Sequence, residues 1–106
     1  MDNSQRYAEV LTQVLRQVAL GQPSLQNLKI QAVCDAEAGQ FLIIGTGWQQ
    51  TAWRNLILFH AWLKDGKIVV EENNFENMMD VLLEAGVVAA DLISVEELEE
   101  VERSVA

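Results

Sequence analysis

The pair formed by Asp65 and Gly66, set between two apolar runs, is the feature that most limits how this chain of 106 residues can fold. Asp-Gly favours the left-handed backbone of a two-residue hairpin turn, so the flanking runs are predicted to pair as antiparallel strands. The turn also fixes which residues face one another along the hairpin. Counting back from the turn makes Glu71 the expected cross-strand partner of His60, the only histidine in the chain.

Three further stretches complete the predicted sheet. Residues 28–34 alternate apolar and polar side chains, as a half-buried strand does. Residues 41–48 are rich in β-branched and aromatic residues, and the two glycines near their end suggest a bulge or a close backbone approach. Residues 53–63 are apolar on both faces, which is typical of a central strand covered on both sides. With residues 67–72, the short connections predict a four-stranded antiparallel meander.

Helical spacing of apolar residues marks the two ends of the chain. From Tyr7 to Val18 they follow the i, i+3, i+4, i+7 rule, with Ser4 as the expected cap and Gly21 as the end. A second helix is predicted to start at a cap formed by Asn73 or Asn74 and to end at Gly86, with the side from Phe75 to Leu83 buried.

A third helix is predicted over about residues 94–105, because Ser94 and Glu97 are spaced as a capping box. Together these segments predict the α+β class in a single domain over residues 1–106. The expected order is an N-terminal amphipathic helix, the four-stranded antiparallel meander sheet and two C-terminal helices. A chain of this length can bury one modest core.

The net charge of −9 is concentrated in the C-terminal third. Residues 1–70 contain five acidic and six basic residues, whereas residues 71–106 contain eleven acidic residues and one arginine. Binding to duplex DNA needs several Lys or Arg side chains, so this pattern disfavours direct nucleic-acid binding. A basic protein partner fits better. In a plainer interpretation, the acidic residues are a solvated face that keeps the chain soluble.

His60 is the natural place to look for chemistry, because Asp65, Glu71 and Glu72 lie close to it in the sequence. A His60–Glu71 pair could serve as a general base or a pH switch. We favour an ordinary polar pair on a sheet face, since no nucleophile or third metal ligand converges on it. Cys34 is the only cysteine and is expected to be a small buried hydrophobe. The sequence thus predicts no catalytic, cofactor-binding or metal-binding residue.

Three tryptophans lie in or beside the two middle strands, and most of them are expected in the core. Trp62 differs, because strand parity places it with His60 and Leu58 on a face that could form an exposed patch. The candidate partner-binding residues are Trp62, His60, Glu71, Glu97 and Glu100.

The location of the protein can also be judged from hydropathy. The N-terminal residues contain no apolar segment typical of a secretory signal, and no run of about 18 apolar residues occurs. We therefore expect a cytoplasmic protein that makes no use of a membrane.

The order of several motifs resembles the XisI family, the excision controlling factors of the cyanobacterial fdxN element. The matching stretches are "VCDAEAGQFLIIGTGW" (Val33 to Trp48), His60 near the end of a long strand, "DGKIVV" (Asp65 to Val70) and "LLEAGVVAADLI" (Leu82 to Ile93). In that family, a Cys/Phe-Asp-x-Glu turn leads into a strand ending in Gly-Trp, and Asp-Gly-Lys-Ile precedes a helix ending in Glu-Ala-Gly-Val. The resemblance covers about Tyr7 to Ile93.

Three departures from the family pattern are visible. The family commonly has Asp-Gly-Thr-Glu where this chain has "NNFE" (Asn73 to Glu76), and His-Val where this chain has Gly45 and Thr46. An acidic helix, about residues 94–105, replaces the family's Arg-bearing aromatic tail.

The resemblance implies an accessory role in programmed DNA excision during heterocyst differentiation, in which a recombinase does the chemistry alongside XisI-type and XisH-type proteins. It implies a non-enzymatic factor that binds an XisH-type protein, and we expect a homo-oligomer formed through the sheet or the acidic helix. It assigns no catalytic residue. Two alternatives stay open, namely a small hydrolase or nuclease that uses His60 with nearby carboxylates, and a DNA-binding accessory.

Overall fold

The computed structural model describes residues 3–21 and 28–105, with side chains as far as residue 100. It confirms the α+β class. The elements in chain order are helix α1 (Ser4–Gly21), strands β1 (Lys29–Asp35), β2 (Gln40–Gln49), β3 (Ala52–Lys64) and β4 (Lys67–Asn73), helix α2 (Met78–Glu84), the 3-10 turn η2 (Ala89–Asp91), strand β5 (Leu92–Ser94) and helix α3 (Val95–Val105).

The sheet has five strands in the order β1-β2-β3-β4-β5, so the predicted four-stranded antiparallel meander is corrected to a mixed sheet. The first four strands are antiparallel neighbours, as predicted. β5 adds a parallel edge, in which Leu92 pairs with Ile68 and Ser94 with Val70. Three residues are too few to show an alternating pattern, so the sequence carries no strand signal there.

The Asp65-Gly66 turn has the predicted geometry. Asp65 and Gly66 have φ values of 53° and 77°, the left-handed pair that a type I′ turn requires, and Lys64 pairs with Lys67. Further along the hairpin the register shifts by one residue, so His60 pairs with Glu72 instead of the predicted Glu71. Glu71 is the extra residue of a β-bulge.

A second bulge lies in β3. Ile43 pairs with Phe59, but the next residue, Ile44, pairs with Ile57, which leaves Leu58 unpaired with β2. Side-chain alternation along β3 is therefore displaced by one residue at Leu58.

This displacement corrects the predicted neighbours of Trp62 on its sheet face. Trp62 and His60 share a face with Ile57, whereas Leu58 and Leu56 lie on the opposite, helix-covered face. Strand parity counted through an unrecognised bulge assigns every residue beyond it to the wrong side.

The glycines of β2 do not mark this bulge, because its extra residue, Leu58, lies on β3 opposite Ile43 and Ile44. Gly45 does mark a close approach, because a Cβ atom at this position would lie 3.3 Å from Cδ1 of Ile30. Gly45 is buried, and the space above it is filled by side chains from the neighbouring strands β1 and β3.

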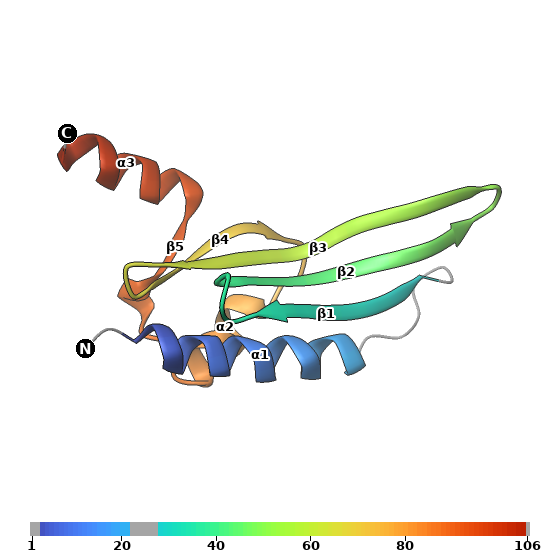
Figure 1. Cartoon of the computed structure of the whole chain (residues 1–106), viewed down its shortest axis with the longest axis horizontal. Helices are drawn as coiled ribbons and strands as arrows, with labels where there is room; N and C mark the ends of the chain where they lie inside the picture. The colour runs from blue at the N-terminus through green and yellow to red at the C-terminus, as the bar shows by residue number, and fades with distance from the viewer. Residues whose placement is uncertain (1–2, 22–27, 106) are drawn as a thin grey trace.

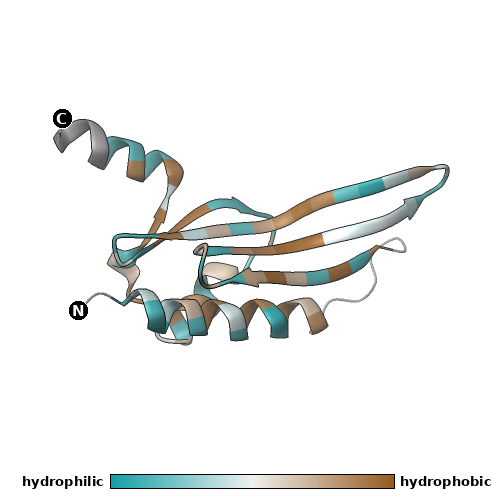
Figure 2. Cartoon of the chain, viewed as in Figure 1, coloured by the Kyte–Doolittle hydropathy of each residue, from teal (hydrophilic) through white to brown (hydrophobic). Residues whose placement is uncertain are grey.

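The core lies between one face of the sheet and the two helices α1 and α2 (Figure 1). Apolar residues concentrate where α1 faces the sheet and run along the middle of β2 and β3 (Figure 2). In β1, alternate side chains point into this layer, as the predicted alternation of residues 28–34 requires. The largest fully buried side chains there are Tyr7, Leu11, Leu15, Phe41, Ile43, Phe59, Ile68, Met78 and Leu82.

The helix ends differ in detail from the predicted caps. The carbonyl of Asn3 accepts the first helical hydrogen bond, from the N–H of Tyr7, so the cap lies one residue before Ser4. The side chain of Asn73 accepts a hydrogen bond from the N–H of Phe75 and closes a turn that precedes α2. The predicted helix start there is therefore wrong, and α2 begins at Met78.

Two of the three later helix predictions are confirmed. Gly86, with φ of 110°, follows the end of α2 as expected. Leu83, predicted on the buried side, is 40% exposed. The hydroxyl of Ser94 accepts a hydrogen bond from the N–H of Glu97 at 3.1 Å, which confirms the predicted cap of α3.

The first half of β3 is not covered on both sides, contrary to the prediction from its composition. All residues from 52 to 57 are exposed. β1 pairs with β2 only as far as Thr46, and β4 pairs with β3 only as far as Phe59. The ends of β2 and β3 therefore project from the sheet as a two-stranded arm, residues 47–57, which extends to the right in Figure 1.

A polar cluster under the sheet edge joins α1, β4 and η2. The Tyr7 ring is fully buried, and its hydroxyl donates to Oδ2 of Asp91 at 2.5 Å and accepts from the N–H of Val88 at 3.3 Å. Nζ of Lys67 lies 3.5 Å from Oδ1 of Asp91. The Tyr7 hydrogen bond, with help from Lys67 and against the effect of burial, holds the pKa of Asp91 below its ordinary value.

Asp91→Asn should lower the urea midpoint at neutral pH, because the amide keeps a hydrogen bond to Tyr7 but loses the attraction to Lys67. A carboxyl whose folded-state pKa is depressed contributes stability above its unfolded pKa of about 3.9 and loses it as the pH falls through the folded value. The difference between wild type and variant should therefore be complete at pH 7 and shrink below about pH 4. Urea unfolding at several pH values measures it.

The matched control for this substitution is Asp80→Asn, at an exposed position in the first turn of α2. It makes the same chemical change outside the cluster and should leave the midpoint almost unaltered. Equal effects of the two variants at every pH would contradict the stabilising role of Asp91.

Candidate functional site

The sheet face turned away from α1 and α2, called the open face here, carries several of the exposed large apolar side chains. Trp48 and Trp53 are 60% and 52% exposed, which corrects the prediction that they belong to the core. They are cross-strand partners on β2 and β3, packed edge to face with ring centroids 5.6 Å apart. Val33 and Ile57 are also exposed on this face.

His60 lies on the open face beside the middle of the sheet. Its Nδ1 is 3.1 Å from Oε2 of Glu71, and its Nε2 is 2.7 Å from Oε1 of Gln40. The predicted His60–Glu71 side-chain contact is therefore confirmed, although the two residues are not register partners. The bulge at Glu71 allows this contact in place of the pairing that simple counting predicts.

This arrangement limits what His60 can do chemically. Each ring nitrogen faces an oxygen atom, so a protonated ring can donate a hydrogen bond from both nitrogens. A neutral ring has only one N–H, so if Nδ1 donates to Glu71, Nε2 must accept a hydrogen bond. The Gln40 amide would then have to turn so that its NH₂ group faces Nε2. A substrate would have to displace Gln40 or Glu71 to reach the ring. Among the described residues, no group of three His, Cys, Asp or Glu side chains is placed to hold a metal ion.

Cys34 offers no activated nucleophile either. It is half-buried on the face of β1 that α1 covers, close to the expected buried position. Burial raises the pKa of its thiol, and the side chain of Thr12 and the charge of Arg16 oppose this only in part. The thiol form therefore dominates at neutral pH.

The other predicted contact residues lie at the end of the sheet near α3. Trp62 is partly buried and pairs with Val69, which is fully buried on the open face. α3 packs against β4 and β5 on this side, and Figure 1 shows it leaving the sheet at the end opposite to the arm. Glu97 and Glu100 are exposed on α3. The five candidates thus comprise a His60–Glu71 contact, Trp62 two residues further along β3, and the glutamates of α3.

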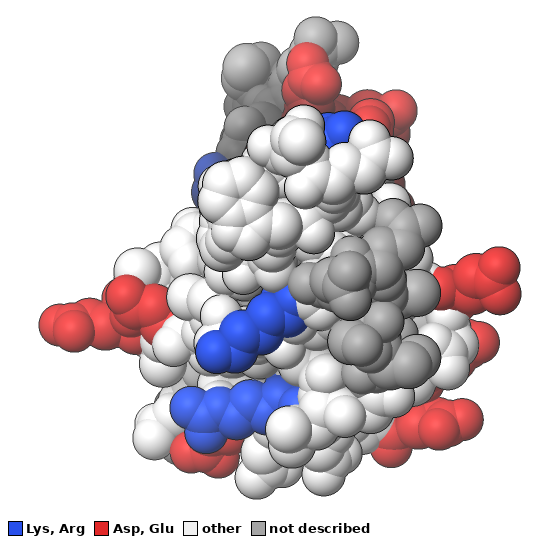
Figure 3. All heavy atoms as spheres, turned by 90° about the vertical axis from the view of Figure 1, so that its right-hand side faces the viewer, with Lys and Arg blue, Asp and Glu red and all other residues white. Residues whose placement is uncertain are grey.

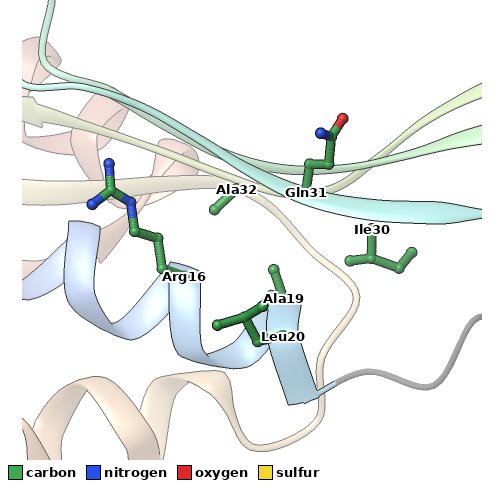
Figure 4. A pocket seen from close by; sticks show the side chains of 6 residues that line it. All are labelled: Arg16, Ala19, Leu20, Ile30, Gln31 and Ala32. Atoms are coloured by element: carbon green, nitrogen blue, oxygen red, sulfur yellow. The ribbon is translucent and has the colours of Figure 1, made fainter.

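A pocket of about 350 Å³ lies between the end of α1 and β1. Figure 4 shows its described lining residues, among which Arg16 is the only charged one. Hydrolytic chemistry commonly uses an acid–base pair or a carboxylate cluster, and the described lining residues supply neither. The lining residues are Arg16, Ala19, Leu20, Ile30, Gln31 and Ala32.

Sequence reasoning missed the two features that most distinguish this surface, the projecting arm and its exposed tryptophan pair. Two signals were available in principle. The stretch from Gly45 to Asn55 alternates weakly and contains small and polar residues, and no acidic residue occurs between Glu37 and Asp65. Neither signal says how far the neighbouring strands extend, and that extent decides which residues are exposed.

The molecule is thus a small α+β domain with one helix-covered sheet face and one face that displays aromatic side chains. A family model described as XisI protein matches residues 1–103. The chain therefore belongs to the XisI family, which confirms the resemblance found in the sequence.

Solved structures agree with this assignment. The chain is similar to a XisI-like protein from Anabaena variabilis, with a TM-score of 0.76, 26% identity and coverage of 85% of this chain and 84% of that one. The fdxN element excision controlling factor XisI from the same organism shares the fold, with a TM-score of 0.71, 21% identity and coverage of 87% and 85%. No match was found among curated proteins. Within the described residues, no helix is long and apolar enough to cross a membrane.

Proposed function

We propose that this chain is a cytoplasmic accessory factor in the programmed excision of a DNA element and that it acts by binding proteins, with no catalytic step of its own. Membership in the XisI family carries this proposal. A solved protein with the same fold is named an excision controlling factor, which supports the role in excision. The recombination chemistry then belongs to a separate recombinase.

The proposed partner is a basic surface on an XisH-type protein. The exposed residues of α3 include Glu96, Glu97, Glu99 and Glu100, and this acidic helix stands at one end of the molecule (Figure 1). Fixed negative charge of this density accelerates encounter with a basic patch and selects against acidic partners. It also repels the phosphate backbone of DNA, so contact with the excised element is assigned to other proteins.

Co-expression with an XisH-type protein from the same genome tests the proposal. We expect a mixed complex that survives purification, recognised by its mass in light scattering. Affinity should fall as salt is raised, because exposed charges are screened over a Debye length of about 8 Å at physiological ionic strength. Two separate species after purification would contradict the proposal.

The double variant Glu97→Lys/Glu100→Lys locates the binding surface. It reverses two exposed charges on α3 and should weaken the complex by at least about tenfold, equivalent to about 1.4 kcal/mol. The double variant Glu9→Lys/Glu37→Lys changes the net charge equally at exposed positions on α1 and in the β1–β2 turn. Isothermal titration of both variants separates a local effect from a general one, and equal losses would contradict docking on α3.

A hydrolase or nuclease based on His60 is the second candidate function, supported by the His60–Glu71 contact of 3.1 Å. If it holds, purified protein should cleave a DNA or ester substrate, and His60→Ala should reduce the rate by about 10² to 10⁴, the usual contribution of a general base. The non-enzymatic proposal predicts instead that His60→Ala leaves any trace activity unaltered while circular dichroism remains native. A loss restricted to His60→Ala and Glu71→Gln would favour the enzyme.

A further inference from the structure

In the part of the chain that the structure describes, one edge of the arm has no strand beside it. β4 stops pairing with β3 at Phe59, and Asn74 then donates its side-chain amide to the carbonyl oxygens of Ile57 and Leu58 at 3.3 Å. None of the described residues pairs with the backbone of β3 from Ala52 to Leu56 on this side. We call this segment the free edge. Its outward N–H and C=O groups form a template for another strand.

Exposed apolar side chains lie on both faces of the arm. Trp53 and Ile57 are 52% and 50% exposed on the open face, and Leu56 is 39% exposed on the other face. A two-stranded hairpin alone is marginally stable in water. Natural sheet edges are commonly blunted by Lys or Pro, but the free edge contains only one charged residue, Arg54, and no proline. These properties are those of an interface and not of a solvated edge.

The charge distribution indicates which molecule binds to the free edge. No Asp or Glu occurs between Glu37 and Asp65, so the arm carries Arg54 and no carboxylate. Figure 3 looks onto the arm end and shows a mainly uncharged surface with some Lys and Arg, whereas Asp and Glu lie at its margins. The exposed glutamates of α3 lie at the other end of a molecule 49 Å long.

For a chain with net charge −9, self-association is opposed by like-charge repulsion. That repulsion is smallest when two copies meet through the ends that carry no carboxylate, because the acidic helices are then farthest apart. A basic partner, in contrast, would be attracted to α3 and away from the arm. A second copy is thus the occupant that both the apolar surface and the charge favour.

We propose that two copies of this chain associate through their arms, with the free edge and the adjoining Ile57 of each copy paired antiparallel about a two-fold axis beside Asn55. Symmetric self-association uses the same surface on both copies, so each residue must suit its counterpart. In this register Trp53 faces Ile57 of the second copy, and Arg54 faces Leu56 of the second copy. The two arms then form one four-stranded ribbon.

The proposed register avoids a direct clash of like charges. Arg54 is not opposite its own copy, whereas Asn55 is, and two side-chain amides can each donate and accept a hydrogen bond. The exposed residues Trp53 and Ile57 become a cross-strand apolar pair, which is the kind that stabilises a sheet most. An extended segment of another protein could also pair with the edge, but it would have to bring apolar side chains to both faces of the arm.

Light scattering or sedimentation of the purified chain across a dilution series gives the first test. We expect a reversible dimer of twice the 11.9 kDa chain mass. Ile57→Lys should raise the dissociation constant at least about tenfold, because it places a charge against the apolar pair on both copies. Val88→Lys is the matched control, since Val88 is 49% exposed against 50% for Ile57 but lies before η2.

Disulfide trapping tests the register. Asn55→Cys in a Cys34→Ser background should form a covalent dimer under mild oxidation, because directly opposed strand residues have Cα atoms about 4.5–5.5 Å apart, within disulfide range. Gln31→Cys in the same background places an exposed thiol on the other edge strand, β1, and should stay monomeric in denaturing electrophoresis.

Several outcomes would overturn the inference. They are a monomer at every concentration, a dimer broken by Val88→Lys and not by Ile57→Lys, and cross-linking at position 31 in place of position 55. Circular dichroism of each variant separates loss of association from loss of fold. The outcome of these dimerisation tests does not depend on the proposed function, because α3 can bind a partner protein whether or not the arms are paired.

Discussion

The hydrogen bond from Tyr7 to Asp91 joins parts of this fold that are far apart in sequence. Tyr7 lies in the first helix and Asp91 in the turn before β5, so one 2.5 Å contact links residues 84 positions apart. Because Lys67 also reaches Asp91, the same cluster joins the start of β4 to the turn. β5 follows directly and pairs with β4 over three residues. The position of α3 therefore depends on this cluster.

The second organising feature is the pair of bulges that interrupt the long hairpin. The bulge at Leu58 displaces side-chain alternation in β3, so His60 and Trp62 lie on the open face together with Trp53. The bulge at Glu71 then lets that carboxylate reach His60 across the strands. Without these two extra residues, strand parity would place a different set of side chains on each face of the sheet.

The parts of the structure that the sequence predicts are those determined locally. The turn at Asp65 and Gly66, the amphipathic first helix and the cap at Ser94 each depend on a few adjacent residues, and each was found. The family could be identified because its motifs recur in order along the chain. The exposure of Trp48 and Trp53 could not be predicted, since it depends on where β1 and β4 stop.

The features that the sequence does not reveal depend on contacts between distant residues or lie in segments too short to show a periodic pattern. A bulge leaves no distinctive residue at Leu58, and β5 is too short for periodicity to reveal it. The Tyr7 side chain looks like any core aromatic until its partner across the fold is known. The His60 contact could be predicted because the turn sets the register to within one residue, and the bulge at Glu71 still lets that carboxylate reach the ring.

The separation of charge along the molecule also makes it an electrical dipole. Negative charge gathers at the α3 end, and the arm at the other end of the 49 Å axis carries none. A basic protein approaching from a distance would experience a torque that turns the α3 end toward it before contact. In a pair joined through the arms, the two dipoles point in opposite directions and cancel. Such a pair would attract basic proteins equally at both ends, so a complex of two copies would display two equivalent, outward-facing docking ends.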